Sequence, residues 1–158
     1  MAAWPSVFVV SGPEAKPSPQ LMEIVEQGRG IHEQLLAMSL GTPHTEGSCW
    51  YGSYLLSKML EQFLAGSSVA IRGGDGCGDG GYRDAQGDWQ GHYWVEVTTP
   101  DGCFVVDVTA DQFGAAPIVV LPIEKAAAQY CPGDQAVVDA QVEEAVAELR
   151  QAGLSGAL

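Results

Sequence analysis

Cys49 is a candidate nucleophile, because both its residue type and its position in the sequence suit that role. It follows Ser48 at the start of a helical pattern, where unpaired backbone N–H groups and the helix dipole favour an anion. A thiol in such a place has its pKa lowered, and the thiolate is the reactive form. The same N–H groups could hold the oxyanion of a tetrahedral intermediate. The alternative is a buried, inert thiol at the start of a core helix.

His92 and Asp107 belong to two runs that are predicted to form an antiparallel hairpin. The runs cover 92–98 and 103–109, and a turn signal stands at 100–102. In this hairpin the two residues fall near opposite each other, with Cβ atoms about 4.5–5.5 Å apart. A carboxylate at that distance can fix the imidazole tautomer and leave the other nitrogen free to take a proton from a thiol. The alternatives are a strand-end histidine and a surface carboxylate.

The sequence around these residues resembles the transglutaminase-like branch of the papain-like thiol enzymes. That branch shows H-x-W-x-E-V and then D-x-T, and the chain has HYWVEV from His92 and DVT from Asp107. SCWY, with Cys49 second, supplies the matching nucleophile segment, so the resemblance covers about 65 residues, from Cys49 to Phe113. The resemblance implies Cys49 as nucleophile, His92 as general base and Asp107 as the residue that orients the base. It also implies a helix packed on an antiparallel sheet. The segment after Asp107 further resembles the end of a group of small bacterial proteins with this triad.

Other residues near the triad are candidates for binding substrate or the oxyanion. No glutamine stands shortly before Cys49 where it would clearly complete a papain-type oxyanion hole, so we consider Trp50 and the loop 42–47 as sources of a second donor. Gln112, like Thr109, either supports the site or simply begins a turn after the strand. Trp94 and Trp89 either line a cleft or belong to the core.

The glycine-rich segment 73–81 is predicted to be a flexible loop that continues in polar style to Gly91, and to act as a mobile flap before His92. Its pattern D-x-C-x-D-G, from Asp75, is similar to a calcium loop, but position twelve is Gln86 instead of Glu. No G-K-[ST] follows the glycines, which argues against a phosphate loop. The cysteines are too dispersed for a zinc site. We therefore expect neither a metal nor a cofactor.

The composition restricts the partners. The chain of 158 residues has 46% hydrophobic and 17% charged residues and a formal charge of −13, with no cluster of basic residues. This disfavours disorder, nucleic-acid binding and anionic membranes. The four cysteines show no C-x-x-C pair, which is typical of reduced thiols. The apolar stretch 2–10 lacks a basic n-region, so we read it as a short strand or an arm and expect a cytoplasmic protein, or one delivered from the cytoplasm to another cell.

The order of elements predicts one α+β domain over 1–158, with an N-terminal arm and linker over 1–19. Helical patterns run from Pro19 to about residue 40, as one helix or two pieces hinged near Gly28–Gly30, and from Cys49 to Leu64. We expect the following further elements: strands at 68–72, 92–98, 103–109 and 118–121, a short helix at 123–130, and a last helix capped by Asp134.

These observations predict a thiol-dependent hydrolase or acyltransferase that cleaves an amide, in a peptide bond or a glutamine side chain, through a thioester. A cysteine peptidase or amidase is favoured. Glutamine deamidation and transglutamination share the same first half-reaction and stay open. The alternative from another class is a non-catalytic module that keeps the fold and binds a basic protein partner.

Overall fold

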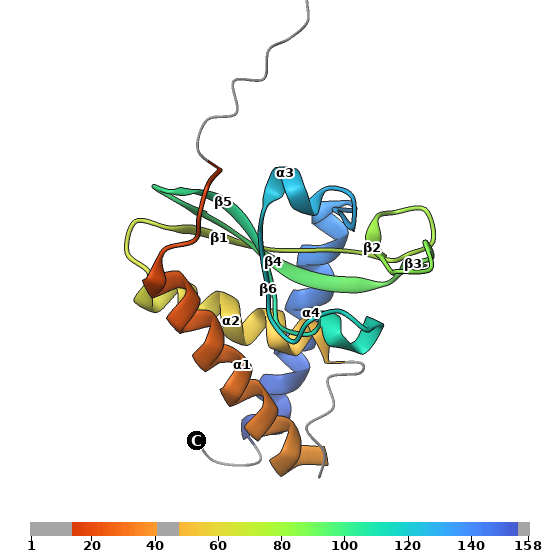
Figure 1. Cartoon of the computed structure of the whole chain (residues 1–158). Helices are drawn as coiled ribbons and strands as arrows, with labels where there is room; N and C mark the ends of the chain where they lie inside the picture. The colour runs from red at the N-terminus through yellow and green to blue at the C-terminus, as the bar shows by residue number, and fades with distance from the viewer. Residues whose placement is uncertain (1–13, 41–47, 155–158) are drawn as a thin grey trace, which may run out of the picture.

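The computed structural model describes residues 14–40 and 48–154, and it has an α+β architecture (Figure 1). The helices are α1 (Pro19–Leu40), α2 (Cys49–Phe63), α3 (Ile123–Ala126) and α4 (Gln135–Leu154), with a 3₁₀ turn η1 (Ala110–Phe113). The strands are β1 (Ser68–Gly74), β2 (Gly81–Arg83), β3 (Trp89–Gln90), β4 (His92–Thr99), β5 (Gly102–Asp107), β6 (Val119–Pro122) and β7 (Tyr130–Cys131). The arm predicted over 2–10 and the loop 42–47 lie outside the described residues.

Local capping explains where the two longest helices begin. The Ser18 hydroxyl accepts a hydrogen bond from the backbone N–H of Leu21, and Pro19 takes the first helical position, as predicted. Asp134 likewise accepts from the N–H of Ala136 at the start of α4. Helix α1 is continuous and has no hinge near Gly28. At Gly28 the two helices pack closely, because a Cβ would come within 3.2 Å of the Leu56 side chain on α2.

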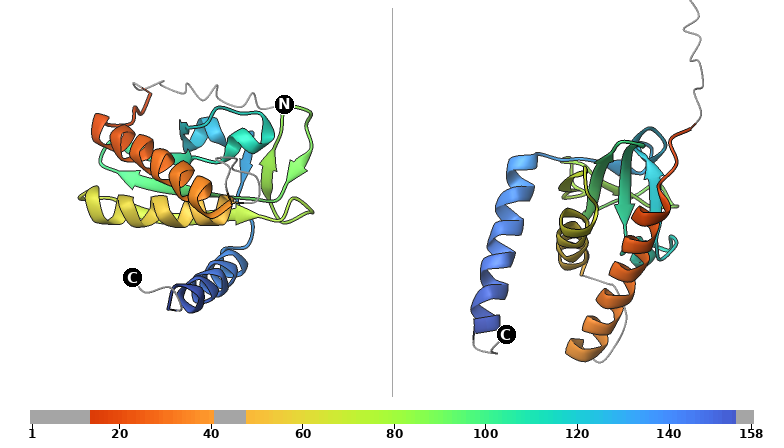
Figure 2. Two further views of the ribbon diagram at one scale, coloured as in Figure 1. Left: turned by 90° about the horizontal axis from the view of Figure 1, so that it is seen from below. Right: turned by 90° about the vertical axis from the view of Figure 1, so that its left-hand side faces the viewer.

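Two antiparallel sheets form the centre of the molecule. Strands β1-β4-β5-β6 make a four-stranded sheet in that order, and β3-β2-β7 make a smaller one. Helices α1 and α2 cover one face of the larger sheet, whereas α3 lies on the other side (Figures 1 and 2). Successive side chains of β4 and β5 point to opposite faces of the sheet, and both faces are covered, so buried residues occur in both sets. Val95, Val97, Phe104 and Val106 pack against leucines of α1 and α2.

A second, aromatic cluster fills the opposite face of the larger sheet. Its buried members are Tyr82, Trp94, Val105, Ala126 and Tyr130. The helix predicted over 123–130 is shorter than expected, because α3 ends at Ala126 and Tyr130 begins β7, where it pairs with Tyr82 of β2. The residues after α3 thus complete the small sheet and close this face.

The segment 73–91 is more ordered than the sequence suggested. It contains β2 and β3 instead of one long loop. The Asp75 carboxylate accepts from the N–H groups of Cys77 and Asp79, and the Asp84 carboxylate accepts from those of Gln86 and Asp88. The glycines serve tight packing, since a Cβ on Gly74 would meet backbone atoms at 2.2 Å. The segment is therefore a pair of closed turns rather than a plain flexible linker.

Helix α4 stands outside the two-helix layer, beyond the edge strand β1 (Figure 2). Its first turn is attached to β1, where the Gln135 side chain donates to the carbonyl of Ile71 and accepts from Arg72. Val138 is its buried anchor. Within the described part of the chain, no helix has both the length and the apolar character that crossing a membrane requires.

Candidate active site

The first residue of α2 is Cys49, and its side chain is partly exposed. Ser48 is the N-cap, as predicted, because its carbonyl accepts from the N–H of Gly52. Its hydroxyl makes no capping bond, however, and lies 3.0 Å from Nε2 of His32 on α1. The N-terminus of a helix favours an anion, and Cys49 lies at that end of α2.

His92 and Asp107 form a buried hydrogen-bonded pair. His92 Nε2 lies 2.7 Å from Asp107 Oδ2, and the two residues are only 1% and 2% exposed. A carboxylate oxygen accepts, so Nε2 carries the proton and donates it. In the neutral ring, Nδ1 is then the nitrogen with a free lone pair, as a general base requires.

The hairpin register differs by two residues from the one predicted for this pair. Val95 pairs with Val106, so Asp107 lies at the level of Trp94 and not opposite His92. His92 and Asp107 are nevertheless on the same face of the sheet and form a diagonal pair, which long side chains can bridge. The predicted proximity of the two residues is confirmed, whereas the predicted register is two residues out.

Four donors surround the Asp107 carboxylate. Oδ1 accepts from the backbone N–H of Thr109 at 2.8 Å and from its hydroxyl at 3.2 Å. Oδ2 accepts from His92 at 2.7 Å and from the Tyr130 hydroxyl at 2.9 Å. Because a buried carboxylate without donors is costly, this arrangement holds a negative charge next to the imidazole.

The pKa of His92 depends on both of its neighbours. Burial lowers the pKa, but the charge and hydrogen bond of Asp107, together with those of the Cys49 side chain, outweigh burial and raise it from 6.5 to about 9. The Cys49 thiol therefore lies within interaction range of the ring. At neutral pH the imidazole is therefore protonated, and its positive charge faces the Cys49 side chain.

Gln112 lies beside Nδ1 of His92, the ring nitrogen that faces away from Asp107. Its Nε2 is 3.3 Å from His92 Nδ1 and also donates to the Thr109 carbonyl at 3.0 Å. The side chain thus approaches the ring from η1, on the edge opposite Asp107. This position suits either a donor to the substrate or a residue that orients the imidazole.

Of the three tryptophans predicted near the site, Trp89 is 43% exposed in β3, and the other two have different environments. Trp50 is partly exposed in the first turn of α2 and contacts Tyr51 edge-on. Trp94 is fully buried and packs against His92 and Tyr130. Trp94 therefore belongs to the core and does not line a cleft, whereas Trp50 stays a candidate for contact with substrate.

Arg29 of α1 is a supporting residue that sequence reasoning missed. Its guanidinium makes a bidentate ion pair with Asp111, at 2.9 Å for each bond, and donates to the Val108 carbonyl at 2.6 Å. These bonds hold the segment that carries Thr109 and Gln112. Glutamates and glutamines occur along the same helix, so the sequence offered no distinctive signal for Arg29.

His32 and Gly52 join α1, α2 and η1 behind Cys49. His32 is fully buried, and its pKa is lowered by burial and by the charge of Arg29, so the ring is neutral when it bonds Ser48. A Cβ on Gly52 would come within 3.0 Å of Thr109 and 3.2 Å of His32. The glycine permits the close approach of α2 to the residues that hold Asp107.

Comparisons with known proteins give no neighbour for this arrangement: no family model, no curated protein and no solved structure matches the chain.

Proposed function

We propose that this protein is a thiol-dependent hydrolase or acyltransferase that acts on an amide through a thioester at Cys49. The observation that carries the proposal is the placement of His92, which donates from one ring nitrogen to a buried carboxylate and interacts with the Cys49 thiol. A nucleophile, a base and a group that orients the base are the parts that acyl transfer needs.

In the proposed reaction, the Cys49 thiolate attacks the amide carbonyl carbon and forms a tetrahedral oxyanion. N–H groups in the first turn of α2 are suited to stabilise this oxyanion. The C–N bond then breaks, the His92 imidazolium gives its proton to the leaving amine, and a thioester remains. Water attacks the thioester while His92 takes one proton of the water, and collapse of this second tetrahedral intermediate releases the carboxylic acid and restores the Cys49 thiolate and the His92 imidazolium. Asp107 keeps the Nε2 proton in place throughout.

We propose hydrolysis of a peptide or of a protein amide as the outcome, which makes the protein a cysteine peptidase or amidase. Deamidation of a protein glutamine differs only in the leaving group, which is ammonia. Transglutamination differs only in the acceptor, which is an amine instead of water. The acyl-enzyme is common to the three, so trapping it tests the shared proposal.

The test is intact-mass detection of a covalent adduct after incubation with peptide, amide and protein-glutamine substrates. We expect an adduct on Cys49 in the native protein and none in Cys49→Ala. The variants Cys77→Ala, Cys103→Ala and Cys131→Ala are matched controls that should keep the adduct. An adduct on another cysteine, or turnover that survives Cys49→Ala, would show that Cys49 is not the nucleophile.

A second measurement separates the enzyme from a binding module. At pH 6.5 iodoacetamide should alkylate Cys49 faster than the other three cysteines, because a thiolate reacts and a thiol does not. Equal rates at all four positions would favour the non-catalytic module.

A further inference from the structure

The oxygen of Asp107 that His92 uses is shared with a third residue. Asp107 Oδ2 accepts from His92 Nε2 at 2.7 Å and from the Tyr130 hydroxyl at 2.9 Å. Tyr130 comes from β7, in the small sheet, which the triad itself does not require. A hydrogen bond to a charged acceptor draws negative charge toward its donor.

The hydroxyl of Tyr130 is not needed to orient the carboxylate. The other oxygen, Oδ1, is already held by the N–H and the hydroxyl of Thr109, and the backbone of Asp107 pairs with Val119 of β6. The contribution of Tyr130 to this site is therefore electrostatic more than positional.

The ring of Tyr130 is likewise held without its hydroxyl. It is 4% exposed and makes edge-on contacts with Tyr82, at 5.1 Å between ring centroids, and with Trp94, at 5.2 Å. A phenylalanine would keep these contacts, so removal of the hydroxyl isolates one hydrogen bond.

We propose that Tyr130 acts through Asp107: its hydroxyl shares the oxygen to which His92 donates and so weakens the hold of Asp107 on the His92 proton. The proposal rests on the proposed function, because it concerns the same imidazole. In that reaction His92 must give up its proton to the leaving group, and an unshared carboxylate would hold the imidazolium too strongly. Tyr130 would thus keep His92 able to act as an acid.

The other groups that face His92 are consistent with this role. Asp107 approaches from β5, Cys49 from α2, and the Tyr82 ring from β2 at 5.7 Å between centroids. Burial and the nearby charge of Asp107 raise the pKa of Tyr130 above its usual value, so Tyr130 is a protonated donor at neutral pH. Burial also raises the pKa of Tyr82, but no hydrogen bond joins its hydroxyl to Asp107 among the described residues.

The experiment is an NMR titration of the His92 ring in the full chain, in the native protein, in Tyr130→Phe and in Tyr82→Phe. We expect the His92 midpoint to rise by about 0.5 to 1 pH unit in Tyr130→Phe, since one hydrogen bond to a charged group is lost. Tyr82→Phe is the matched control and should leave the midpoint unchanged. An unchanged or lowered midpoint in Tyr130→Phe overturns the proposal.

A second variant keeps the test decisive if Tyr130→Phe does not fold. Incorporation of 3-fluorotyrosine at position 130 keeps the ring and makes the hydroxyl a stronger donor, so the His92 midpoint should fall. A midpoint that stays the same or rises contradicts the proposal. Neither titration needs a substrate. The role of Tyr130 and the proposed function can therefore fail independently: the first is judged by the His92 midpoint and the second by the acyl-enzyme adduct.

Discussion

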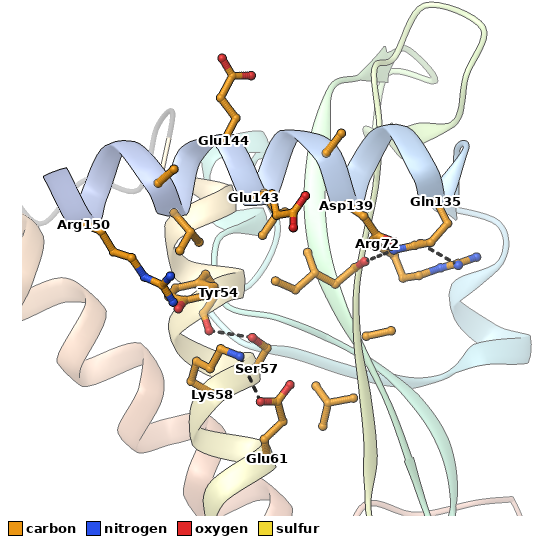
Figure 3. Close-up of a pocket in the computed structure, with 17 residues that line it drawn as sticks. Tyr54, Ser57, Lys58, Glu61, Arg72, Gln135, Asp139, Glu143, Glu144 and Arg150 are labelled. Atoms are coloured by element: carbon orange, nitrogen blue, oxygen red, sulfur yellow. Dashed lines mark hydrogen bonds and ion pairs between the residues drawn. The ribbon is translucent and has the colours of Figure 1, made fainter.

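The structure has a groove whose walls are α2, β1 and α4 (Figure 3). The charged groups of this groove and those of the site around Asp107 differ in how far they are exposed to solvent. The His92–Asp107 pair has side chains that are 0% and 1% exposed. In the groove, Lys58 and Glu61 form a 3.2 Å ion pair whose side chains are 54% and 48% exposed (Figure 3). Solvent screens the second pair and hardly reaches the first. A strong electrostatic effect is therefore expected at the buried His92–Asp107 pair and not at the exposed Lys58–Glu61 pair.

The groove has a volume of about 1160 Å³, but its lining includes none of the triad residues. Its walls are α2, β1 and α4, with Glu143 pointing inward and Glu144 outward (Figure 3). Tyr93 lies near the site and contacts α4: its hydroxyl bonds Gln141, and its pKa is raised by burial and by the charge of Cys49. The comparison shows that cavity size alone does not locate the candidate chemistry.

The largest difference between the two regions should appear in turnover, when one aspartate of each region is replaced by asparagine. Asp107→Asn should slow Cys49-dependent turnover by about 10²–10⁴-fold, because an amide that donates to His92 selects the wrong tautomer. Asp139→Asn, in the groove, removes a carboxylate that accepts only from Gln135 among the described residues, and should change the rate less than twofold. Steady-state rates on the substrate that forms the adduct provide the measurement. Similar losses in both variants would abolish the distinction between the regions.

The pH dependence of stability should also come from the site. His92 has its pKa raised to about 9, so its contribution to the free energy of unfolding is fully present below about pH 6.5 and is lost as pH rises through about 9. The loss is at most about 3 kcal/mol, since one pKa unit corresponds to about 1.4 kcal/mol. Denaturant unfolding at several pH values measures it. His92→Gln serves as the control and should show a flatter profile over this window; an identical slope would contradict the raised pKa.

Two glycine substitutions inside helices should have opposite signs. At Gly52 a Cβ would meet Thr109 at 3.0 Å and His32 at 3.2 Å, so Gly52→Ala should destabilise the protein by about 1–3 kcal/mol. At Gly30 a Cβ would meet nothing within 4 Å, so Gly30→Ala should stabilise it by about 0.5–1 kcal/mol. Thermal and denaturant unfolding of both variants gives the comparison. A stabilising Gly52→Ala would mean that α2 can move away from Thr109 without cost.

The smallest effect is expected in the groove. Lys58→Gln removes an exposed ion pair with Glu61, and the unfolding free energy should change by no more than about 0.5 kcal/mol. The alkylation rate of Cys49 should not change. Denaturant unfolding and timed alkylation at pH 6.5 check the two statements. A marked change in the alkylation rate would reveal coupling from the groove to the site.

Patterns within short stretches of sequence predicted much of the framework. Ser18-Pro19 marked the start of α1, Cys49 was expected at the start of α2, and the alternation in 92–109 predicted the β4–β5 hairpin. The pairing of His92 with Asp107 followed from that hairpin, because only fifteen residues separate the two. Periodicity and capping are local properties, which is why they can be read without a structure.

Tertiary structure decided the details that complete the site. The diagonal offset of His92 and Asp107 depends on the register of the whole sheet. The bond from Arg29 to Asp111 joins residues 82 positions apart, and Tyr130 reaches Asp107 only because β7 pairs with β2. Such contacts arise from packing between elements that are far apart in the sequence. One arginine or one tyrosine forms no periodic pattern, so the sequence alone does not predict its partner. The amino-acid sequence therefore determined which residues could react, while the packing of α1, the sheets and β7 determined which donors surround the Asp107 carboxylate.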